Sequence, residues 1–366
     1  MSSNIRKIAI TTGGGDAPGL NAVIKSVVIS AHNRGWECVG IRDGYNGLLF
    51  PERYPDGGIV PLSPQKVNHI TPLGGTILGS TNKGNPLKYP IRQADGTIEQ
   101  IDISDKLVAM FTQAGIDAVV ALGGDGSLSI ACELWKKGLH IVGVPKTIDN
   151  DLEKTVVTFG FDTAVAFATE CIDRLHTTAQ SHGRIMVVEV MGRYAGWIAL
   201  YAGIATSADV ILIPELPYDI TKVAQHIKER VWPQKKYAIV VVAEGAVPLN
   251  GTVSIVDKNG QERLGGIGEK VANELEELTG KETRAVVLGH LLRGGSPTAH
   301  DRIISLRFGA AAVRALAEGQ NGIMVALDPP YIQYVPLTEV SQRMKCVPID
   351  GDTVITAMDM GTSFGQ

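Results

Sequence analysis

Nine short apolar runs rich in valine, isoleucine and alanine recur along the 366-residue chain. They span residues 8–12, 38–41, 118–122, 141–144, 185–190, 210–213, 238–242, 285–288 and 323–327. Segments with the apolar spacing of a helix lie between them, such as the series Val165, Ala168 and Ile172. This alternation predicts an α/β protein whose parallel sheets are covered by helices on both faces. Because nine strands with long crossovers are many for one sheet, we expect two doubly wound, Rossmann-like domains.

Two other stretches have the composition of antiparallel hairpins. Residues 89–102 have Asp95-Gly96 at their centre, and residues 252–264 have Asn259-Gly260. Both stretches are polar, so we expect them to be insertions at the surface. No low-complexity linker divides the chain, which predicts two domains whose chain segments are interleaved.

The composition restricts the partners and the compartment. The chain has 34 lysines and arginines against 38 aspartates and glutamates, a net charge of −4, so nucleic acid is not an expected partner. No apolar run reaches the roughly 18 residues of a membrane span, and the N-terminus lacks a signal-peptide core, so no membrane association is expected. The 4 cysteines have no close spacing that would suggest a zinc site or a disulfide framework, and reduced thiols are typical of a cytoplasmic protein.

Residues 144–151 combine two carboxylates, a threonine and a lysine directly after an apolar run. If this segment is extended, Asp149 and Asp151 share one face, because side chains two residues apart point the same way. A carboxylate near an alcohol can accept its proton, while Thr147 and Lys146 can hold the phosphate that the alcohol attacks. The segment therefore predicts the chemical centre of a phosphoryl transferase. A polar loop with Asp and Asn as turn formers is an equally typical interpretation of these eight residues by themselves.

Three glycine-rich turns near predicted strands are typical of phosphate-binding loops. Residues 11–21 contain Gly13-Gly14-Gly15, residues 73–83 end in Asn82 and Lys83, and residues 121–127 contain Gly123-Gly124-Asp125-Gly126-Ser127. Main-chain amides of such turns bind phosphate oxygens, particularly beside a helix N-terminus. Asp125 can in addition contact a magnesium ion that bridges the phosphates. The first turn has neither the P-loop nor the dinucleotide-binding spacing, and a plain tight turn is its alternative.

Charged and polar residues also lie at the ends of the strands predicted in the second half. They are Arg184, Met191-Gly192-Arg193, Glu244, Arg284, His290 and Arg293. An arginine binds phosphate through two parallel donors, so several arginines near strand ends predict a pocket for a phosphate monoester. Glu244 can accept hydrogen bonds from sugar hydroxyls. Each of these residues, taken singly, is also compatible with a solvated surface charge.

Together, five of these motifs resemble those of the phosphofructokinase family, in the same order. They are Gly14-Gly15-Asp16-Ala17-Pro18-Gly19, residues 123–127, residues 145–151, residues 188–193 and Gly289-His290-Leu291-Leu292-Arg293-Gly294-Gly295-Ser296-Pro297. The resemblance extends from residue 8 to about residue 325, and five ordered matches leave little room for chance. It implies the phosphofructokinase fold and the activity of an ATP:fructose-6-phosphate 1-phosphotransferase of glycolysis.

The resemblance also implies roles for single residues. Asp149 is expected to take the proton from the sugar 1-hydroxyl, and Lys146, Thr147 and Arg193 are the other expected catalytic residues. Asp125 is expected to hold Mg²⁺. The expected donor contacts are Gly14, Asn82, Lys83, Gly124, Asp125, Gly126 and Ser127, and the expected sugar-phosphate contacts are Thr147, Ile148, Asp149, Arg184, Met191, Gly192, Arg193, Glu244, Arg284, His290 and Arg293. The family has an arginine where this chain has Asn82, so Lys83 is expected to replace that contact.

The same resemblance implies separate roles for the two domains and contacts between subunits. Residues 1–160 and 292–342 are expected to form the nucleotide and phosphoryl-donor domain, and residues 161–291 and 343–366 the sugar-phosphate domain. In the family, the residues matching Arg184 and Arg284 reach into the site of a neighbouring subunit. The resemblance therefore implies a homodimer or homotetramer with shared active sites.

The identity of the phosphoryl donor depends on two positions. In the family, glycine at position 126 goes with ATP, because an aspartate there crowds the α-phosphate, whereas lysine at position 146 is typical of pyrophosphate enzymes. This chain combines Gly126 with Lys146. Because steric exclusion is harder to evade than the gain from one cation, we expect ATP, with pyrophosphate as the alternative. A catalytically silent sugar-phosphate sensor is the non-enzyme alternative, and the presence of Asp125 and Asp149 argues against it.

Overall fold

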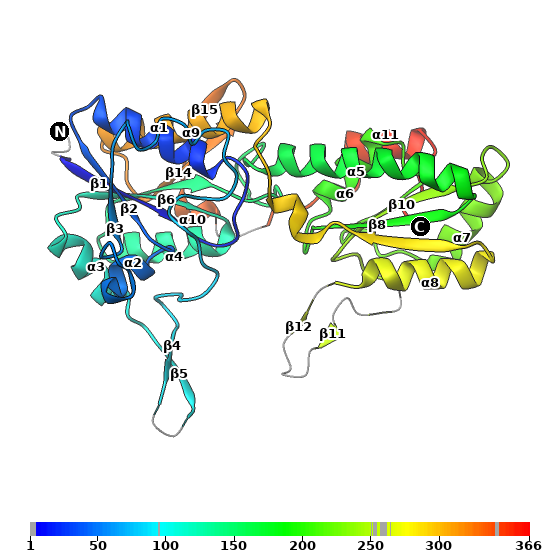
Figure 1. The fold of residues 1–366 in the computed structure, drawn as a ribbon, viewed down its shortest axis with the longest axis horizontal. Coiled ribbons are helices and arrows are strands. Elements are labelled where there is room, and N and C mark those ends of the chain that lie inside the picture. Colours follow the sequence, from blue (N-terminus) through cyan, green and yellow to red (C-terminus); the bar gives the residue numbers. More distant parts are fainter. Residues whose placement is uncertain are drawn as a thin grey trace. The chain divides into compact units, whose positions relative to one another are not determined.

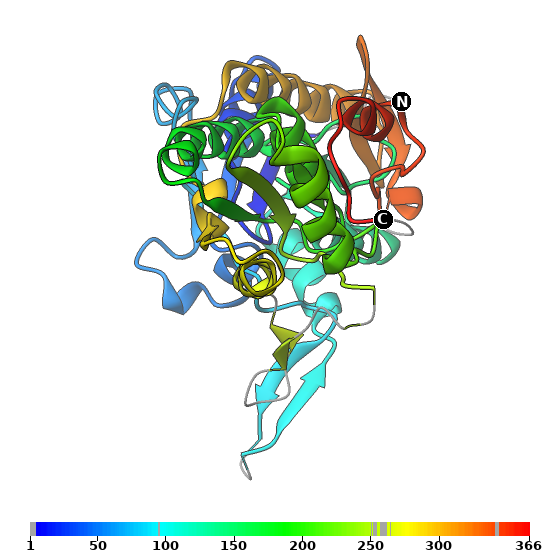
Figure 2. The same cartoon turned by 90° about the vertical axis from the view of Figure 1, so that its right-hand side faces the viewer.

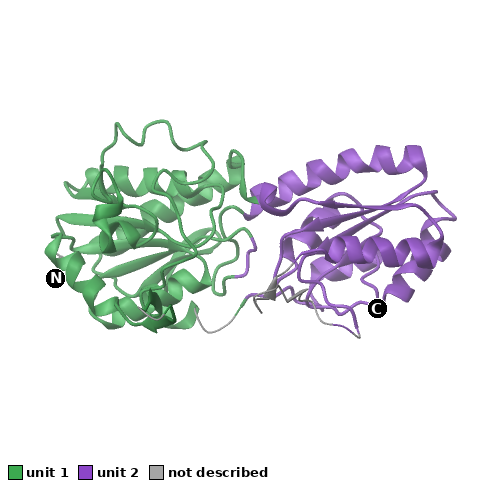
Figure 3. Cartoon of the chain, turned by 60° about the horizontal axis from the view of Figure 1, so that its bottom comes forward, with its two compact units in different colours: residues 1–148, 152–160, 293–344 green, residues 149–151, 161–292, 345–366 purple. Residues whose placement is uncertain are grey.

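The computed structural model describes residues 5–93, 96–249, 251, 255–256, 262–263, 265–340 and 344–366. The chain forms two compact units, shown in green and purple in Figure 3. Unit 1 consists of Met1–Ile148, Leu152–Gly160 and Arg293–Met344, and unit 2 consists of Asp149–Asp151, Phe161–Leu292 and Lys345–Gln366. The chain therefore passes between the units several times, as the absence of a linker in the sequence predicts. The expected division places residues 149–151 in the first domain, whereas the structure counts them with unit 2.

Unit 1 is built on a seven-stranded sheet (Figure 1). The order across the sheet is β15 (Tyr331–Pro336), β14 (Ile323–Asp328), β7 (Ile141–Pro145), β6 (Ala118–Gly123), β1 (Lys7–Thr12), β2 (Glu37–Ile41) and β3 (Ile59–Leu62). The five inner strands are parallel, while β3 and β15 pair antiparallel at the two edges. All six residues of β6 are buried, as a strand covered on both faces requires.

Helices cover both faces of this sheet (Figure 1). Helices α1 (Leu20–His32) and α9 (Ala299–Ala317) pack over one face, and α2 (Asn46–Leu49), α3 (Ser104–Gln113), α4 (Asp125–Lys136) and α10 (Leu337–Val340) lie over the other. The side chains of β1 alternate accordingly: Ile8 and Ile10 pack with α1 and α9, and Ala9 packs with α3 and α4. Thr298 caps α9 by accepting a hydrogen bond from the amide of Asp301 at 3.2 Å.

Unit 2 is a smaller doubly wound layer structure. Its four-stranded parallel sheet has the order β13 (Thr283–Val287), β8 (Ile185–Val190), β10 (Ala238–Ala243) and β9 (Val210–Leu212). Its helices are α5 (Phe161–His182), α6 (Trp197–Ala205), α7 (Ile220–His226), α8 (Ile267–Thr279) and α11 (Asp352–Asp359). Helices α7 and α8 pack against the face that carries Ile185, Val187 and Val240. The predicted fold class, with two α/β units, is confirmed.

Both predicted hairpins are present. Strands β4 (Tyr89–Arg92) and β5 (Ile98–Ile101) pair antiparallel and extend away from the sheet of unit 1 (Figures 1 and 2). Strands β11 (Ile255–Val256) and β12 (Glu262–Arg263) also pair antiparallel. Asp95 and Asn259-Gly260, expected at the tips, lie outside the described residues. Among the described helices, none combines the length and the apolar character that a membrane crossing needs.

Candidate active site

In unit 1, the glycine-rich turns meet at the carboxyl ends of three neighbouring strands. The turn of residues 13–15 follows β1, Gly124 follows β6, and Lys146 follows β7. Hydrogen bonds fix these turns to one another, since Gly13 N donates to Leu122 O at 2.9 Å and Lys146 N donates to Gly123 O at 2.9 Å. Ligands of open α/β sheets gather at this edge.

Two expected donor contacts, Asn82 and Ser127, and the expected catalytic residue Lys146 converge around Gly14. A methyl group placed on Gly14 would lie 3.2 Å from Lys146 Nζ, 3.5 Å from Ser127 Oγ and 4.0 Å from Asn82 Oδ1. Gly14 has φ of 80°, a conformation that favours glycine. The Lys146 ammonium is buried and donates a hydrogen bond to Gly15 O, so its charge also stabilises the glycine turn.

The turn of residues 73–83 is tied to the same place. Gly14 N donates to Thr81 O at 3.1 Å, and Ser80 Oγ donates to Gly14 O at 2.5 Å. Asn82 and Lys83, which follow directly, are exposed. The structure thus brings Asn82 to the glycine turns. It leaves the ammonium of Lys83 at the surface, where its expected contact with phosphate stays a prediction.

Residues 124–127 have the geometry of an anion site. Helix α4 begins at Asp125, and Gly124 precedes it in an extended conformation, so the first amides of the helix are available to an anion. A methyl group on Gly126 would meet no atom within 4 Å, which means that this side of the helix start faces open space. Asp125 is exposed beside it.

These residues also fit a magnesium ion that arrives with a nucleotide. Among the described residues, no group of three or more His, Cys, Asp or Glu side chains could hold a metal ion. A hard cation at this edge would therefore rely on Asp125 together with phosphate oxygens and water, which is how Mg²⁺ commonly binds beside phosphates. The structure provides Asp125 in the place that such an arrangement needs.

Two expected site residues next to β7 are buried. Thr147 is 9% exposed, and its carbonyl accepts a hydrogen bond from Thr158 Oγ1 at 2.7 Å. Ile148 is 0% exposed, so neither its side chain nor its main chain is open to solvent in this structure, and its expected contact with a substrate stays a prediction. Arg293 lies beside the first glycine turn, where it donates to Asp16 O at 3.2 Å. The structure therefore groups Arg293 with the turns of unit 1.

In unit 2, the expected sugar-phosphate residues gather at the carboxyl edge of the sheet. Met191 and Gly192 follow β8, Glu244 follows β10, and His290 lies in the 3₁₀ turn Gly289–Arg293 after β13. The three strands are parallel neighbours, so their ends coincide. Glu244 N donates to Val190 O at 2.9 Å, and this bond holds the two strand ends together.

Close packing at this edge requires glycine. Gly245 N donates to Gly192 O at 3.1 Å, and a methyl group on Gly245 would lie 1.9 Å from Arg193 O. Arg193 and His290 are exposed, while Glu244 is partly buried. The guanidinium of Arg193 lies 4.9 Å from the centre of the Tyr194 ring. The edge thus presents an acid, a guanidinium and an imidazole on a rigid main-chain base.

The segment of residues 149–151 belongs to unit 2 and is not extended. Asn150 is buried and has φ of 53°, so the chain turns between the two aspartates. The expectation that Asp149 and Asp151 share a face, as in a strand, is therefore wrong. Asn150 Oδ1 accepts a hydrogen bond from Lys345 Nζ at 2.9 Å, and Asp151 O accepts one from Lys345 N at 2.9 Å. The sequence contains no signal for Lys345, because it lies 195 residues further along the chain.

Arg184 and Arg284 were expected to follow strands, and this expectation is wrong, because both lie at the opposite, amino-terminal end of the same sheet. Arg184 directly precedes β8, and Arg284 pairs with Met186 near its start. Arg184 Nε donates to Glu282 Oε2 at 2.7 Å, and Arg284 also donates to Glu282. The hydrogen bond from Arg184 is the main reason why the pKa of Glu282 lies below its ordinary value. At about 3.3 Å per residue, β8 separates Arg184 from Met191 by about 20 Å.

No role was predicted for Glu189, a buried carboxylate within the motif of residues 188–193. Glu189 in β8 is 3% exposed and accepts a hydrogen bond from Gly268 N at 2.8 Å. It thereby binds an amide in the first turn of α8, where the helix dipole favours negative charge. A charged residue inside an otherwise apolar run was the signal for such a role.

Comparisons with known proteins agree with this arrangement. The sequence matches the phosphofructokinase family over residues 7–316. It is 49% identical over 366 residues to a Chloroflexus aurantiacus protein named ATP-dependent 6-phosphofructokinase, covering 100% of this chain and 99% of the relative. It is 50% identical over 350 residues to an Amycolatopsis methanolica protein named pyrophosphate–fructose 6-phosphate 1-phosphotransferase, covering 93% of this chain and 96% of the relative.

A solved structure has the same fold. The crystal structure of Pichia pastoris phosphofructokinase in the T-state matches with a TM-score of 0.76 and 32% sequence identity. The match covers 98% of this chain and 36% of that longer chain. The predicted resemblance is confirmed by these comparisons, and the chain belongs to the phosphofructokinase family.

Proposed function

We propose that the protein transfers a phosphoryl group from ATP to the 1-hydroxyl of fructose 6-phosphate, giving fructose 1,6-bisphosphate and ADP. The observation that carries this proposal is the convergence of Asn82, Ser127 and Lys146 on Gly14 at the carboxyl edge of the unit 1 sheet. Main-chain amides and a cation at such an edge suit a polyphosphate. Unit 1 would bind the donor, and unit 2 would bind the sugar phosphate through residues at its own carboxyl edge.

The choice of ATP rests on Gly126. Relatives named for ATP and for pyrophosphate have nearly equal identities, 49% and 50%, so overall similarity does not separate the donors. A side chain at position 126 would extend into space that no protein atom occupies within 4 Å. An aspartate there would repel the α-phosphate of ATP, whereas glycine leaves room for it. Lys146, the feature that favours pyrophosphate, already donates a hydrogen bond within the glycine turn.

The residues would share the chemistry as follows. Asp149 would accept the proton of the 1-hydroxyl as the oxygen attacks. Thr147, Lys146 and Arg193 would hold and neutralise the transferred phosphoryl group. Asp125 would hold Mg²⁺, which when bound neutralises charge on the phosphate oxygens of the donor.

We propose further that the protein is a homodimer or homotetramer in which Arg184 and Arg284 bind the sugar phosphate of a neighbouring subunit. By the length of β8, Arg184 lies about 20 Å from the carboxyl edge of its own sheet, and Arg284, which is level with Met186, lies about 15 Å from it. A site completed by a second copy gives both arginines a ligand that their own chain does not bring to them. A cytoplasmic location is proposed with this activity, and the four cysteines, which lie in the described ranges, are in the reduced form.

A side-by-side assay tests the proposed function. The purified protein is incubated with fructose 6-phosphate and Mg²⁺, and turnover with ATP is compared with turnover with pyrophosphate. We expect ATP to be the better donor. Higher turnover with pyrophosphate would favour the alternative donor, and tight binding of fructose 6-phosphate without turnover of either donor would favour the sensor.

A further inference from the structure

Lys345–Gln366 is the last segment of unit 2, called here the C-terminal segment. Its first residue, Lys345, lies against residues 149–151. Lys345 bonds to these residues twice: its main-chain N donates to Asp151 O and its Nζ donates to Asn150 Oδ1, both at 2.9 Å. All these residues belong to unit 2, although Lys345 follows Asn150 by 195 positions. One residue therefore contacts both positions that follow Asp149.

Lys345 is itself held firmly by unit 2. Its carbonyl accepts a hydrogen bond from Trp197 Nε1 at 2.9 Å, and its Nζ lies 5.6 Å from the centre of the Trp197 ring. Two residues later, Val347 N donates to Glu215 Oε1 at 2.8 Å, and the same carboxylate accepts from Gly196 N at 3.0 Å. These hydrogen bonds connect the segment to the start of α6 and to the loop after β9.

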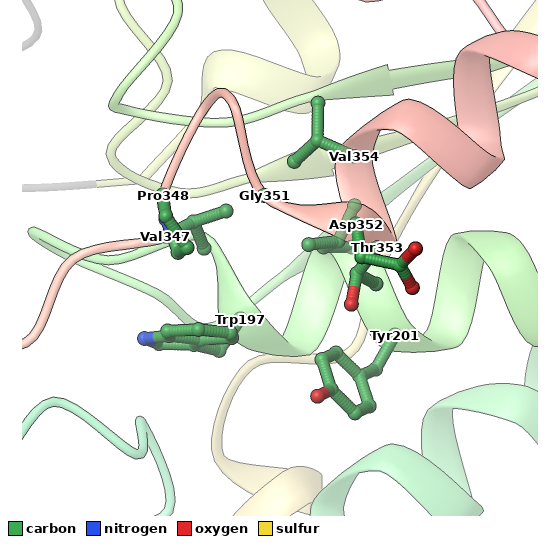
Figure 4. Close-up of a pocket in the computed structure, with 9 residues that line it drawn as sticks. Trp197, Tyr201, Val347, Pro348, Gly351, Asp352, Thr353 and Val354 are labelled. Atoms are coloured by element: carbon green, nitrogen blue, oxygen red, sulfur yellow. The ribbon is translucent and has the colours of Figure 1, made fainter.

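A small cavity marks where this segment crosses α6. It has a volume of about 150 Å³, and its lining includes Trp197 and Tyr201 from α6, and Val347, Pro348 and Asp352 from the C-terminal segment. Figure 4 shows Trp197 and Val347 on either side of this space. Lys345 does not line the cavity, although its contact Trp197 does.

The conformation of Asn150 explains why such support is needed. Its φ of 53° lies in the left-handed region, which asparagine adopts more readily than most residues other than glycine but which still costs conformational energy. Asn150 is 4% exposed, and the hydrogen bond from Lys345 gives its buried side-chain oxygen a charged donor. Loss of this donor would allow the backbone that follows Asp149 to relax.

We propose that Lys345 is a positioning residue for the catalytic base. It holds residues 150 and 151 in the turn that aims the Asp149 carboxylate, without touching a substrate. This inference rests on the proposed function, because it assigns Asp149 to the transfer step. A misplacement of about 1 Å at a reacting group commonly costs up to about 100-fold in rate. The effect is therefore expected in kcat and not in the affinity for either substrate.

The experiment uses the full chain with Lys345→Met, which keeps the length of the side chain and removes the ammonium. We expect kcat with ATP and fructose 6-phosphate to fall roughly 10- to 100-fold, with both KM values little changed. Lys345→Arg should restore part of kcat, because it restores a charged donor. The matched control is Lys281→Met, since Lys281 Nζ also lies over a tryptophan of unit 2, 5.5 Å from the Trp232 ring centre.

A second variant distinguishes the loss of the hydrogen bond from a general folding defect. Asn150→Gly removes the acceptor but tolerates the left-handed backbone, so it tests the same bond from the other side. We expect the double variant Lys345→Met with Asn150→Gly to lose no more kcat than the more impaired single variant. Losses that multiply, or a fully active Lys345→Met, would overturn the inference. Absence of turnover in the unmodified protein would instead defeat the proposed function.

Discussion

The carboxyl edges of the two sheets present their functional groups in different ways. At the edge of unit 1, turns tied together by main-chain hydrogen bonds expose amides, and a methyl group on Gly14 would already approach Lys146 Nζ to 3.2 Å. At the edge of unit 2, glycines support the main chain, and the exposed groups are the side chains of Arg193, Glu244 and His290. The first edge is specified mainly by backbone and the second mainly by side chains.

This difference matches the chemistry of the proposed ligands. A polyphosphate offers repeated, similar oxygens, which suit repeated amides and a helix N-terminus. A sugar phosphate offers hydroxyls and one phosphate at distinct places, which suit separate acids and bases. Substitutions should therefore act differently at the two edges: loss of a side chain should impair unit 2, and gain of a negatively charged side chain should impair unit 1.

The largest effect is expected from Asp149→Ser in unit 2. Loss of the proposed base should lower kcat roughly 1,000-fold, because a positioned proton acceptor commonly contributes between about 100- and 10,000-fold. The dissociation constant of fructose 6-phosphate, measured by calorimetry, should change little. The control is Asp173→Ser, an exposed aspartate on α5 of the same unit. A parallel loss of sugar-phosphate binding would mean that Asp149 stabilises the fold of the edge and does not act as the base.

A smaller and more selective effect is expected from Gly126→Asp in unit 1. The Cβ of the added aspartate would meet no atom of another part of the protein within 4 Å, so the fold should tolerate it, while its charge should repel the α-phosphate of ATP. We expect kcat/KM for ATP to fall about 100-fold, and the value for pyrophosphate to fall less. Gly126→Ala is the uncharged control and should remain close to the unmodified protein. An unchanged ratio of the two donors would show that position 126 does not select between them.

The strands could be predicted because a buried strand requires a run of apolar residues in the sequence. Each of the nine apolar runs became a parallel strand, since strands covered on both faces must be apolar throughout. The antiparallel edge strands β3 and β15 have less distinct apolar patterns in the sequence. Pro61 interrupts β3, and β15 alternates between exposed and partly buried residues such as Tyr331 and Ile332.

The glycine turns of the candidate site could be placed from the sequence, but the local backbone geometry could not. The glycine turns were visible because few other residues readily adopt a positive φ such as the 80° of Gly14. The turn at Asn150 was not visible, because it depends on Lys345, a partner 195 positions away. Ile148 likewise gave no sign that its side chain would be buried completely. Local spacing predicts chemistry well, whereas backbone direction at a strand end depends on distant contacts.

The smallest effect is expected at the end of the unit 2 sheet opposite the sugar-phosphate residues. Arg284→Ser removes a guanidinium that its own chain pairs with Glu282 and places 3.8 Å from Glu276 Oε2. If a neighbouring subunit supplies the site, KM for fructose 6-phosphate should rise about 10-fold or more, as expected for loss of one charged hydrogen bond.

Mixed oligomers separate this explanation from a local one. When Arg284→Ser protomers are combined with Asp149→Ser protomers by unfolding and refolding, one class of site receives Asp149 from the first and Arg284 from the second. Such sites are intact, so the mixture should regain low-KM activity that neither variant has alone. Complementation requires that the two residues act in one site from different chains. If the mixture shows only the sum of the separate activities, Arg284 interacts with Glu282 and Glu276 of its own chain and does not reach a neighbouring site. In that case, the carboxyl edge of unit 2 would bind the sugar phosphate without Arg284 of a neighbouring subunit.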